Sequence, residues 1–135
     1  MDRRKFLAFI GVVMVTPVLA EPEEDSGMYG LIVKLTIVPE RRDEMIRILR
    51  ESAVNMAGCF SYVVAKDSAD ENANWVSEVW DSIASHDASL SLPSVKSAIP
   101  RAKEIVSKFD RVAVTSPVWG VGLPAVHIGS WHEHG

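Results

Sequence analysis

The histidine at position 86 is the side chain in this sequence best suited to moving a proton. An imidazole takes up or releases a proton near neutral pH, as a general base must. Ile83, His86 and Leu90 fall at positions i, i+3 and i+7 of a short helix predicted over residues 82–90, so His86 should lie on the buried face of that helix. His86 is therefore a candidate catalytic residue. The same spacing is also typical of a core histidine satisfied by a backbone carbonyl.

Aromatic side chains are the second feature that could carry chemistry. Aromatic rings can wall a cavity for a flat ligand, and Tyr62, Trp75 and Trp80 are the candidate substrate-binding residues. Trp80 ends a predicted strand just before the helix of His86, which suits a cavity wall. Small cores and subunit interfaces use the same residue types, so packing is the alternative role. The aromatic residues that could line such a cavity are Phe60, Tyr62, Trp75, Trp80 and Phe109.

Three histidines near the end of the chain are secondary candidates for metal binding. His127, His132 and His134 lie close to Glu133, and imidazoles beside a carboxylate can bind copper or zinc. Their spacing matches no standard metal-binding motif, so the sequence predicts no metal and no cofactor. It also contains no glycine-rich nucleotide loop and no Gly-x-Ser-x-Gly motif.

The elements that must position these side chains follow from hydrophobic periodicity. Alternation of apolar residues predicts strands, and apolar residues at helical spacing predict helices. The helix that begins at Pro93 should break or kink near Ile99, because Pro100 interrupts it. The predicted strands span residues 30–38, 59–66, 74–80 and 110–118, and the helices begin near residues 40, 82 and 93. This order predicts an α+β, ferredoxin-like split βαβ fold with a four-stranded antiparallel sheet and helices on one face.

The uncovered face of that sheet predicts a partner. Both faces of the first strand carry apolar residues, and Trp75 and Trp80 point to opposite sides of the third strand. An apolar sheet face needs another layer to cover it. A homodimer packed sheet to sheet, forming a dimeric α/β barrel, is the simplest solution.

The N-terminus predicts export. Residues 1–20 combine a basic start, an apolar run and the small-residue exit Val18-Leu19-Ala20, the three parts of a cleavable signal peptide. Arg3-Arg4-Lys5-Phe6-Leu7 resembles a twin-arginine signal, with ordinary Sec export and an uncleaved anchor as alternatives. We therefore expect a periplasmic or secreted protein. An acidic, disordered lead-in should follow over residues 21–28, then one domain over 29–119 and an extended tail over 120–135.

Composition limits the partners. The chain carries 14 basic and 18 acidic residues; loss of residues 1–20 removes three basic residues and one acidic residue and leaves 11 − 17 = −6. A negative surface repels phosphate backbones, so nucleic acid is excluded as a partner. The apolar run is too short to span a bilayer comfortably, and no other membrane span is predicted in the mature chain. Cys59 is the single cysteine and can form no intrachain disulfide.

Several motifs together resemble the antibiotic biosynthesis monooxygenase family, which includes quinol monooxygenases. The most specific is the strand end Ser77-Glu78-Val79-Trp80 followed by the helix residue His86. The resemblance covers about residues 30–118. Its other parts are Lys34-Leu35-Thr36-Ile37-Val38-Pro39, Arg42-Asp43-Glu44, Gly58-Cys59-Phe60-Ser61-Tyr62 and Pro93-Ser94-Val95.

The resemblance implies a function and roles for two residues. Such a protein would oxidise a quinol or another phenolic aromatic compound with molecular oxygen, without metal or flavin. His86 would then accept the phenol proton or pair with the resulting anion, and Trp80 would form a wall of the cavity. The resemblance also implies a homodimer. The alternative function is a non-catalytic exported dimer that binds a small apolar ligand or a partner protein.

Overall fold

The computed structural model describes residues 27–124. The predicted export signal, most of the predicted lead-in and the histidines at 127, 132 and 134 lie outside these residues. Seven elements follow one another: β1 (Tyr29–Ile37), α2 (Arg42–Ser52), β2 (Cys59–Lys66), β3 (Ala73–Trp80), α3 (Ile83–Ser89), α4 (Pro93–Ile105) and β4 (Val106–Thr115).

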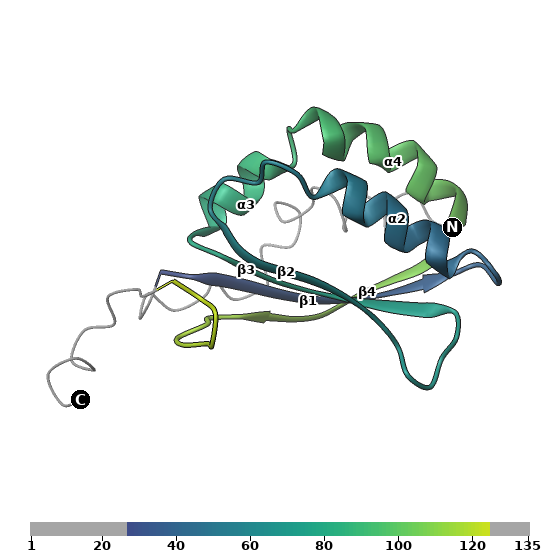
Figure 1. Ribbon diagram of the computed structural model, residues 1–135, viewed down its shortest axis with the longest axis horizontal. Coiled ribbons are helices and arrows are strands. Elements are labelled where there is room, and N and C mark those ends of the chain that lie inside the picture. The colour runs from purple at the N-terminus through teal and green to yellow at the C-terminus, as the bar shows by residue number, and fades with distance from the viewer. Residues whose placement is uncertain (1–26, 125–135) are drawn as a thin grey trace, which may run out of the picture.

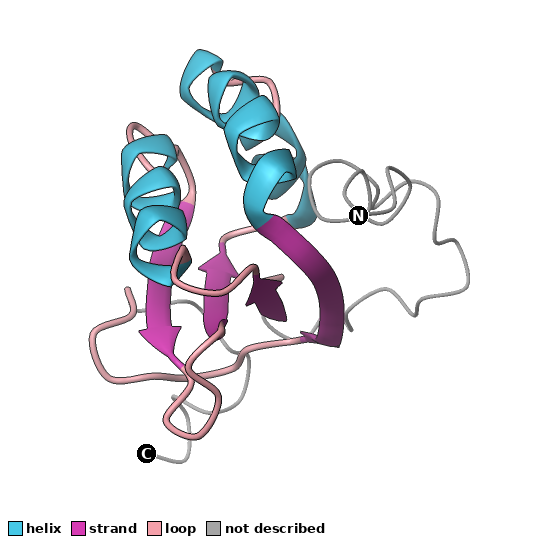
Figure 2. Ribbon diagram, turned by 90° about the vertical axis from the view of Figure 1, so that its right-hand side faces the viewer, coloured by secondary structure: helices cyan, strands magenta, loops and turns pink. Residues whose placement is uncertain are grey.

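The four strands form one sheet in the order β2-β3-β1-β4, with every neighbouring pair antiparallel. All three helices lie on the same side of this sheet (Figure 1), and Figure 2 shows the two longer helices side by side above the strands. This arrangement confirms the predicted α+β, ferredoxin-like fold. Among the described residues, no helix is both long and apolar enough to cross a membrane.

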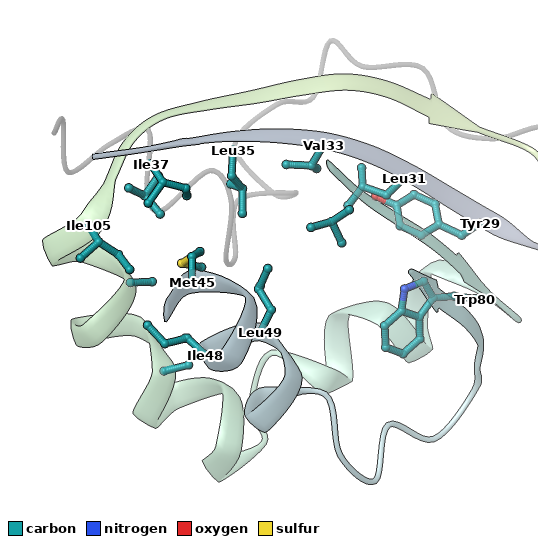
Figure 3. Packing of buried hydrophobic residues seen from close by; sticks show 14 residues of the cluster. Tyr29, Leu31, Val33, Leu35, Ile37, Met45, Ile48, Leu49, Trp80 and Ile105 are labelled. Carbon is teal, nitrogen blue, oxygen red and sulfur yellow. The ribbon is translucent and has the colours of Figure 1, made fainter. Parts of the chain in front are cut away.

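The core lies between the sheet and α2 and α4. Alternate residues of β1, from Tyr29 to Ile37, point toward the helices. They pack against Met45, Ile48 and Leu49 of α2 (Figure 3). Val33, Leu35 and Met45 are fully buried. Burial of each such side chain stabilises the fold by roughly 1.5–3 kcal/mol, so the strict alternation of β1 fixes which face of the strand meets the helices.

Two predictions about the C-terminal half are wrong. Of the break or kink expected near Ile99, the break is absent, because α4 continues through Pro100 to Ile105. Pro100 lies on the exposed side of α4, where the loss of one backbone hydrogen bond does not stop the helix. The last strand starts at Val106, directly after the helix, and not at residue 110. Pairing of β4 with β1 as far as Ile37 and Val106 draws these residues into the sheet.

A close contact between β1 and the end of β4 depends on a glycine. A Cβ atom placed on Gly30 would come within 2.0 Å of Thr115 Oγ1 and 2.9 Å of Pro117 Cγ. Only a residue without a side chain lets the two strands approach so closely. Gly30 therefore allows β1 to pair closely with the end of β4, next to Tyr29.

Candidate active site

A cavity of about 60 Å³ lies between the helices and the sheet. Its walls are mostly apolar side chains from α2 and α4, with polar groups from β2, β3 and α3. The side chains around it come from Met45, Ile48, Leu49, Ser52, Met56, Tyr62, Glu78, Trp80, His86, Ser89, Leu90, Val95, Ala98, Ile99 and Ala102. Three predicted site residues, Tyr62, Trp80 and His86, therefore meet at one cavity.

Strand alternation brings Glu78 and Trp80 to this cavity. Both lie on the helix-facing side of β3, because Glu78 pairs with Leu31 and Trp80 with Tyr29 in the register with β1. Tyr62 reaches the same side from β2, where it pairs directly with Glu78. Residues paired across an antiparallel sheet share a face, so the sheet presents these three side chains together.

The start of α3 positions His86. Ser82 caps the helix, and its Oγ accepts a hydrogen bond from the backbone N–H of Ser85 at 3.1 Å. Ser82 has the extended backbone of an N-cap, so the helix begins at Ile83, one residue later than predicted. His86 then follows one turn later on the face that meets the sheet, as the helical spacing predicted.

His86 is buried among aromatic rings, with 4% of its surface exposed. Its ring lies 5.2 Å from the ring of Tyr29 and 5.5 Å from that of Trp80, with an angle of 84° between the planes of His86 and Trp80. The polar partner of the imidazole is a carboxylate, since Nδ1 lies 3.2 Å from Asp87 Oδ1. The alternative of a core histidine held by a backbone carbonyl therefore does not describe this contact.

Glu78 is a functional candidate that the sequence reasoning did not select. Its carboxyl is buried, and Oε1 accepts a hydrogen bond of 2.9 Å from Trp80 Nε1. Burial raises the pKa of Glu78, while the charge of His86 and the bond from Trp80 act in the opposite direction. The signal was present in the sequence, because Glu78 stands two residues before Trp80 in a strand and must share its face.

Tyr62 and Cys59 stay protonated at the edge of this group. Burial raises the pKa of the Tyr62 phenol, and the nearby Glu78 adds to the effect. Burial also raises the pKa of the Cys59 thiol, again with a contribution from Glu78. A thiolate is the reactive form of cysteine, so Cys59 is a poor nucleophile, whereas Tyr62 can serve as a hydrogen-bond donor.

Trp75, the remaining predicted substrate-binding residue, lies on the opposite face of the sheet. It pairs with Lys34 in β1, and the Lys34 ammonium lies 5.7 Å from the centre of its ring. Its Nε1 donates a hydrogen bond of 2.7 Å to Asp67 Oδ2 in the β2–β3 turn. Trp75 therefore does not line the cavity with the other candidates.

The described residues contain no group of three or more His, Cys, Asp or Glu side chains that could hold a metal ion. The secondary metal candidates His127, His132 and His134 fall outside the described residues, so the structure gives no geometry for them.

The size of the cavity limits what it can hold. An apolar cavity of about 150 Å³ accommodates benzene, which is more than twice the 60 Å³ of this cavity. A ring-sized ligand would therefore have to displace lining side chains. Met45 and Met56 are suited to this movement, because methionine is unbranched and adapts its shape readily.

Comparison with known proteins places the chain in a family. The family model described as antibiotic biosynthesis monooxygenase matches residues 28–101, more than half of the 135 residues. A crystal structure from Chloroflexus aurantiacus, provisionally named an antibiotic biosynthesis monooxygenase, is 50% identical with a TM-score of 0.69 and covers 72% of this chain and 99% of its own.

More distant structures share the fold. Proteins with the same provisional name from Caulobacter crescentus and Nitrosomonas europaea are 18% and 9% identical, with TM-scores of 0.62 and 0.64. Each comparison covers 70% of this chain and 93% of the other. No curated protein shows a significant match. The matched family model and the half-identical structure together show that this chain belongs to the antibiotic biosynthesis monooxygenase family.

Proposed function

We propose that this protein is a monooxygenase that oxidises a quinol or a similar phenol with molecular oxygen and needs no cofactor. The observation that carries the proposal is the meeting of buried His86 with Trp80 and Tyr62 at a cavity whose other walls are largely apolar. An imidazole in such a place can remove a phenol proton, and the apolar walls keep the resulting anion away from water.

The reaction balances without another reductant. His86 accepts the proton of the phenol, and the electron-rich phenolate then transfers electrons to oxygen, which forms a bond to a ring carbon. One oxygen atom stays on the ring and the other leaves as water, so that a hydroquinone and O₂ give a hydroxyquinone and water. Trp80 forms a wall against the ring, and the protonated Tyr62 phenol can donate a hydrogen bond to the substrate oxygen.

The proposed setting is an exported homodimer. Export to the periplasm or outside the cell rests on the signal features of residues 1–20. Dimerisation is supported by the sheet face turned away from the helices, where Ile32, Val63 and Val79 lie on three adjacent strands. Val63 is 51% exposed in the single chain, and a second sheet packed on this face would cover it.

Oxygen uptake tests the proposal. The wild-type protein and His86→Ala are each mixed with a panel of hydroquinones, and oxygen consumption is followed with an electrode. Loss of the base should lower turnover by about 100-fold or more, while circular dichroism shows an unchanged fold. Uptake equal to substrate autoxidation with both proteins would exclude these substrates.

A non-catalytic role in ligand binding is the second candidate, and the small, mainly apolar cavity favours it. In this case small apolar molecules should bind to wild type and to His86→Ala with similar affinity. Isothermal titration calorimetry measures this binding, and it separates the two functions when combined with the oxygen electrode. Binding without oxygen consumption would favour this role.

A further inference from the structure

A buried carboxyl group lines the same cavity as the proposed base, and the proton transfer described above gives it no role. Glu78 is 8% exposed and lines the same cavity as His86. A buried carboxylate is unfavourable unless it is hydrogen-bonded or paired with a positive charge. An amide of the same shape would satisfy the packing without this cost, so the acid requires an explanation.

Trp80 joins Glu78 to His86. Its indole Nε1 donates to Glu78 Oε1 at 2.9 Å, and its ring meets the His86 ring nearly edge-on at 5.5 Å. Trp80 itself is 1% exposed and held by the core. One fixed aromatic side chain therefore contacts both groups and sets where the carboxyl and the imidazole lie.

Glu78 is the enclosed acid among the groups around His86. The titratable groups on the surrounding elements are Asp87 on α3, Glu78 on β3, Tyr62 and Cys59 on β2, and Tyr29 on β1. The side chain of Asp87 is 50% exposed, so water and salt screen its charge. Burial favours the neutral forms of Tyr62 and Cys59. The charge of Glu78 is the one that interacts with His86 away from solvent.

Building on the proposed function, we propose that Glu78 is a positioning residue that acts through His86. When the phenol O–H bond breaks and its proton moves to the imidazole, the Glu78 carboxylate provides the opposite charge that stabilises the imidazolium. In other enzymes a carboxylate hydrogen-bonded to the catalytic imidazole has this effect; Glu78 would act by its charge, from the far side of the Trp80 ring that contacts both groups. No other reactant is required, since only one proton moves from substrate oxygen to ring nitrogen.

Glu78→Gln tests the proposal, because a glutamine carbonyl can still accept the hydrogen bond from Trp80. With hydroquinones, kcat should fall by at least about tenfold while KM changes little. The double variant Glu78→Gln/His86→Ala should be no slower than His86→Ala, because both residues act in one step. The surface change Glu104→Gln on the exposed side of α4 is the matched control and should leave kcat unchanged.

Two results in this assay would overturn the proposal. Wild-type kcat in Glu78→Gln would show that Glu78 only accepts a hydrogen bond. A double variant slower than His86→Ala by the full factor seen for Glu78→Gln would show that Glu78 acts independently of His86.

A second measurement does not depend on activity or on the folding of Glu78→Gln. Carbon-13 NMR of the labelled Glu78 carboxyl gives its pKa in wild type and in His86→Ala. Because the charge of His86 lowers the pKa of Glu78, its removal should raise that pKa. An unchanged value would overturn the proposed pairing. A raised value in a protein that consumes no oxygen would support the pairing and exclude the monooxygenase reaction for the tested substrates.

Discussion

At the scale of single residues, the cavity is lined by a buried acid, Glu78. Glu78 is held by Trp80 Nε1 and by the sheet, and its pKa lies above the usual value of 4.5 mainly because of burial. The folded chain therefore binds this proton more tightly than the unfolded chain does. The stability that protonation of Glu78 contributes is fully present below about pH 4.5 and is lost as the pH rises through the folded-state pKa.

This linkage predicts how stability changes with pH. Glu78→Gln cannot ionise, so it should become more stable relative to wild type as the pH rises above about 4.5. Urea unfolding of both proteins across a pH series measures the difference in the free energy of unfolding. A difference that stays constant over the series would contradict a raised pKa for Glu78.

At the scale of elements, the pairing of β1 with β4 depends on the absence of a side chain at Gly30. Gly30 faces Thr115 and Pro117 so closely that an added methyl group overlaps the threonine oxygen. Overpacking of this kind forces shifts in the neighbouring side chains and backbone. Tyr29 precedes Gly30 in β1 and its ring contacts that of His86, so strain at Gly30 should also reach the cavity.

Gly30→Ala should therefore lower the free energy of unfolding by about 1–3 kcal/mol. Adding Thr115→Ala removes the nearest atom, although Pro117 Cγ remains 2.9 Å from the new methyl group. The double variant should recover part of the loss. Thermal and urea unfolding measure both effects, and equal stability of Gly30→Ala and wild type would show that the strand moves without cost.

Local sequence patterns predicted most helices and strands, but not every position at which one element ends and the next begins. The β-forming residues of 59–66 predicted β2 with its observed limits. The start of β4 could not be read in this way, since residues 106–109 extend only because β1 pairs with them. Strand pairing depends on such distant partners more than helix formation does.

The candidate site was predictable to a similar extent. Helical spacing placed His86 toward the sheet, and the end of a strand placed Trp80 near it, whereas Tyr62 was selected only as an aromatic residue. Trp75 and Trp80 are an odd number of residues apart on β3, so strand alternation predicted that they point to opposite faces of the sheet. The structure shows Trp75 on the face away from the helices. The volume of the cavity could not be predicted, because it depends on how the side chains of α2 and α4 pack together.

At the scale of the whole molecule, one sheet face carries the helices and the other carries an apolar patch. The patch consists of Ile32, Val63, Trp75 and Val79, which the strand register places on the face away from α2 and α4. In the described residues no helix covers this face (Figure 1). A lysine at Val63, on the edge strand β2, would place a charge in any interface formed on this patch.

Val63→Lys should therefore weaken the proposed homodimer by at least about tenfold in its dissociation constant. Val54→Lys is the control, since Val54 is similarly exposed at 45% but follows α2 on the helical side. Analytical ultracentrifugation over a range of concentrations measures the monomer–dimer equilibrium. Two variants with equal association would place the interface elsewhere, and a wild-type protein that stays monomeric would exclude the dimer.

The direct joint between α4 and β4 has a consequence for how this chain can vary in length. Ile105 ends the helix and Val106 starts the strand, and no loop separates them. One inserted residue turns the helix by about 100° per residue, or it moves every strand side chain to the opposite face. Natural relatives should therefore avoid insertions and deletions at this joint. Variation in length should instead collect in the exposed β2–β3 turn, where added residues would extend away from the cavity.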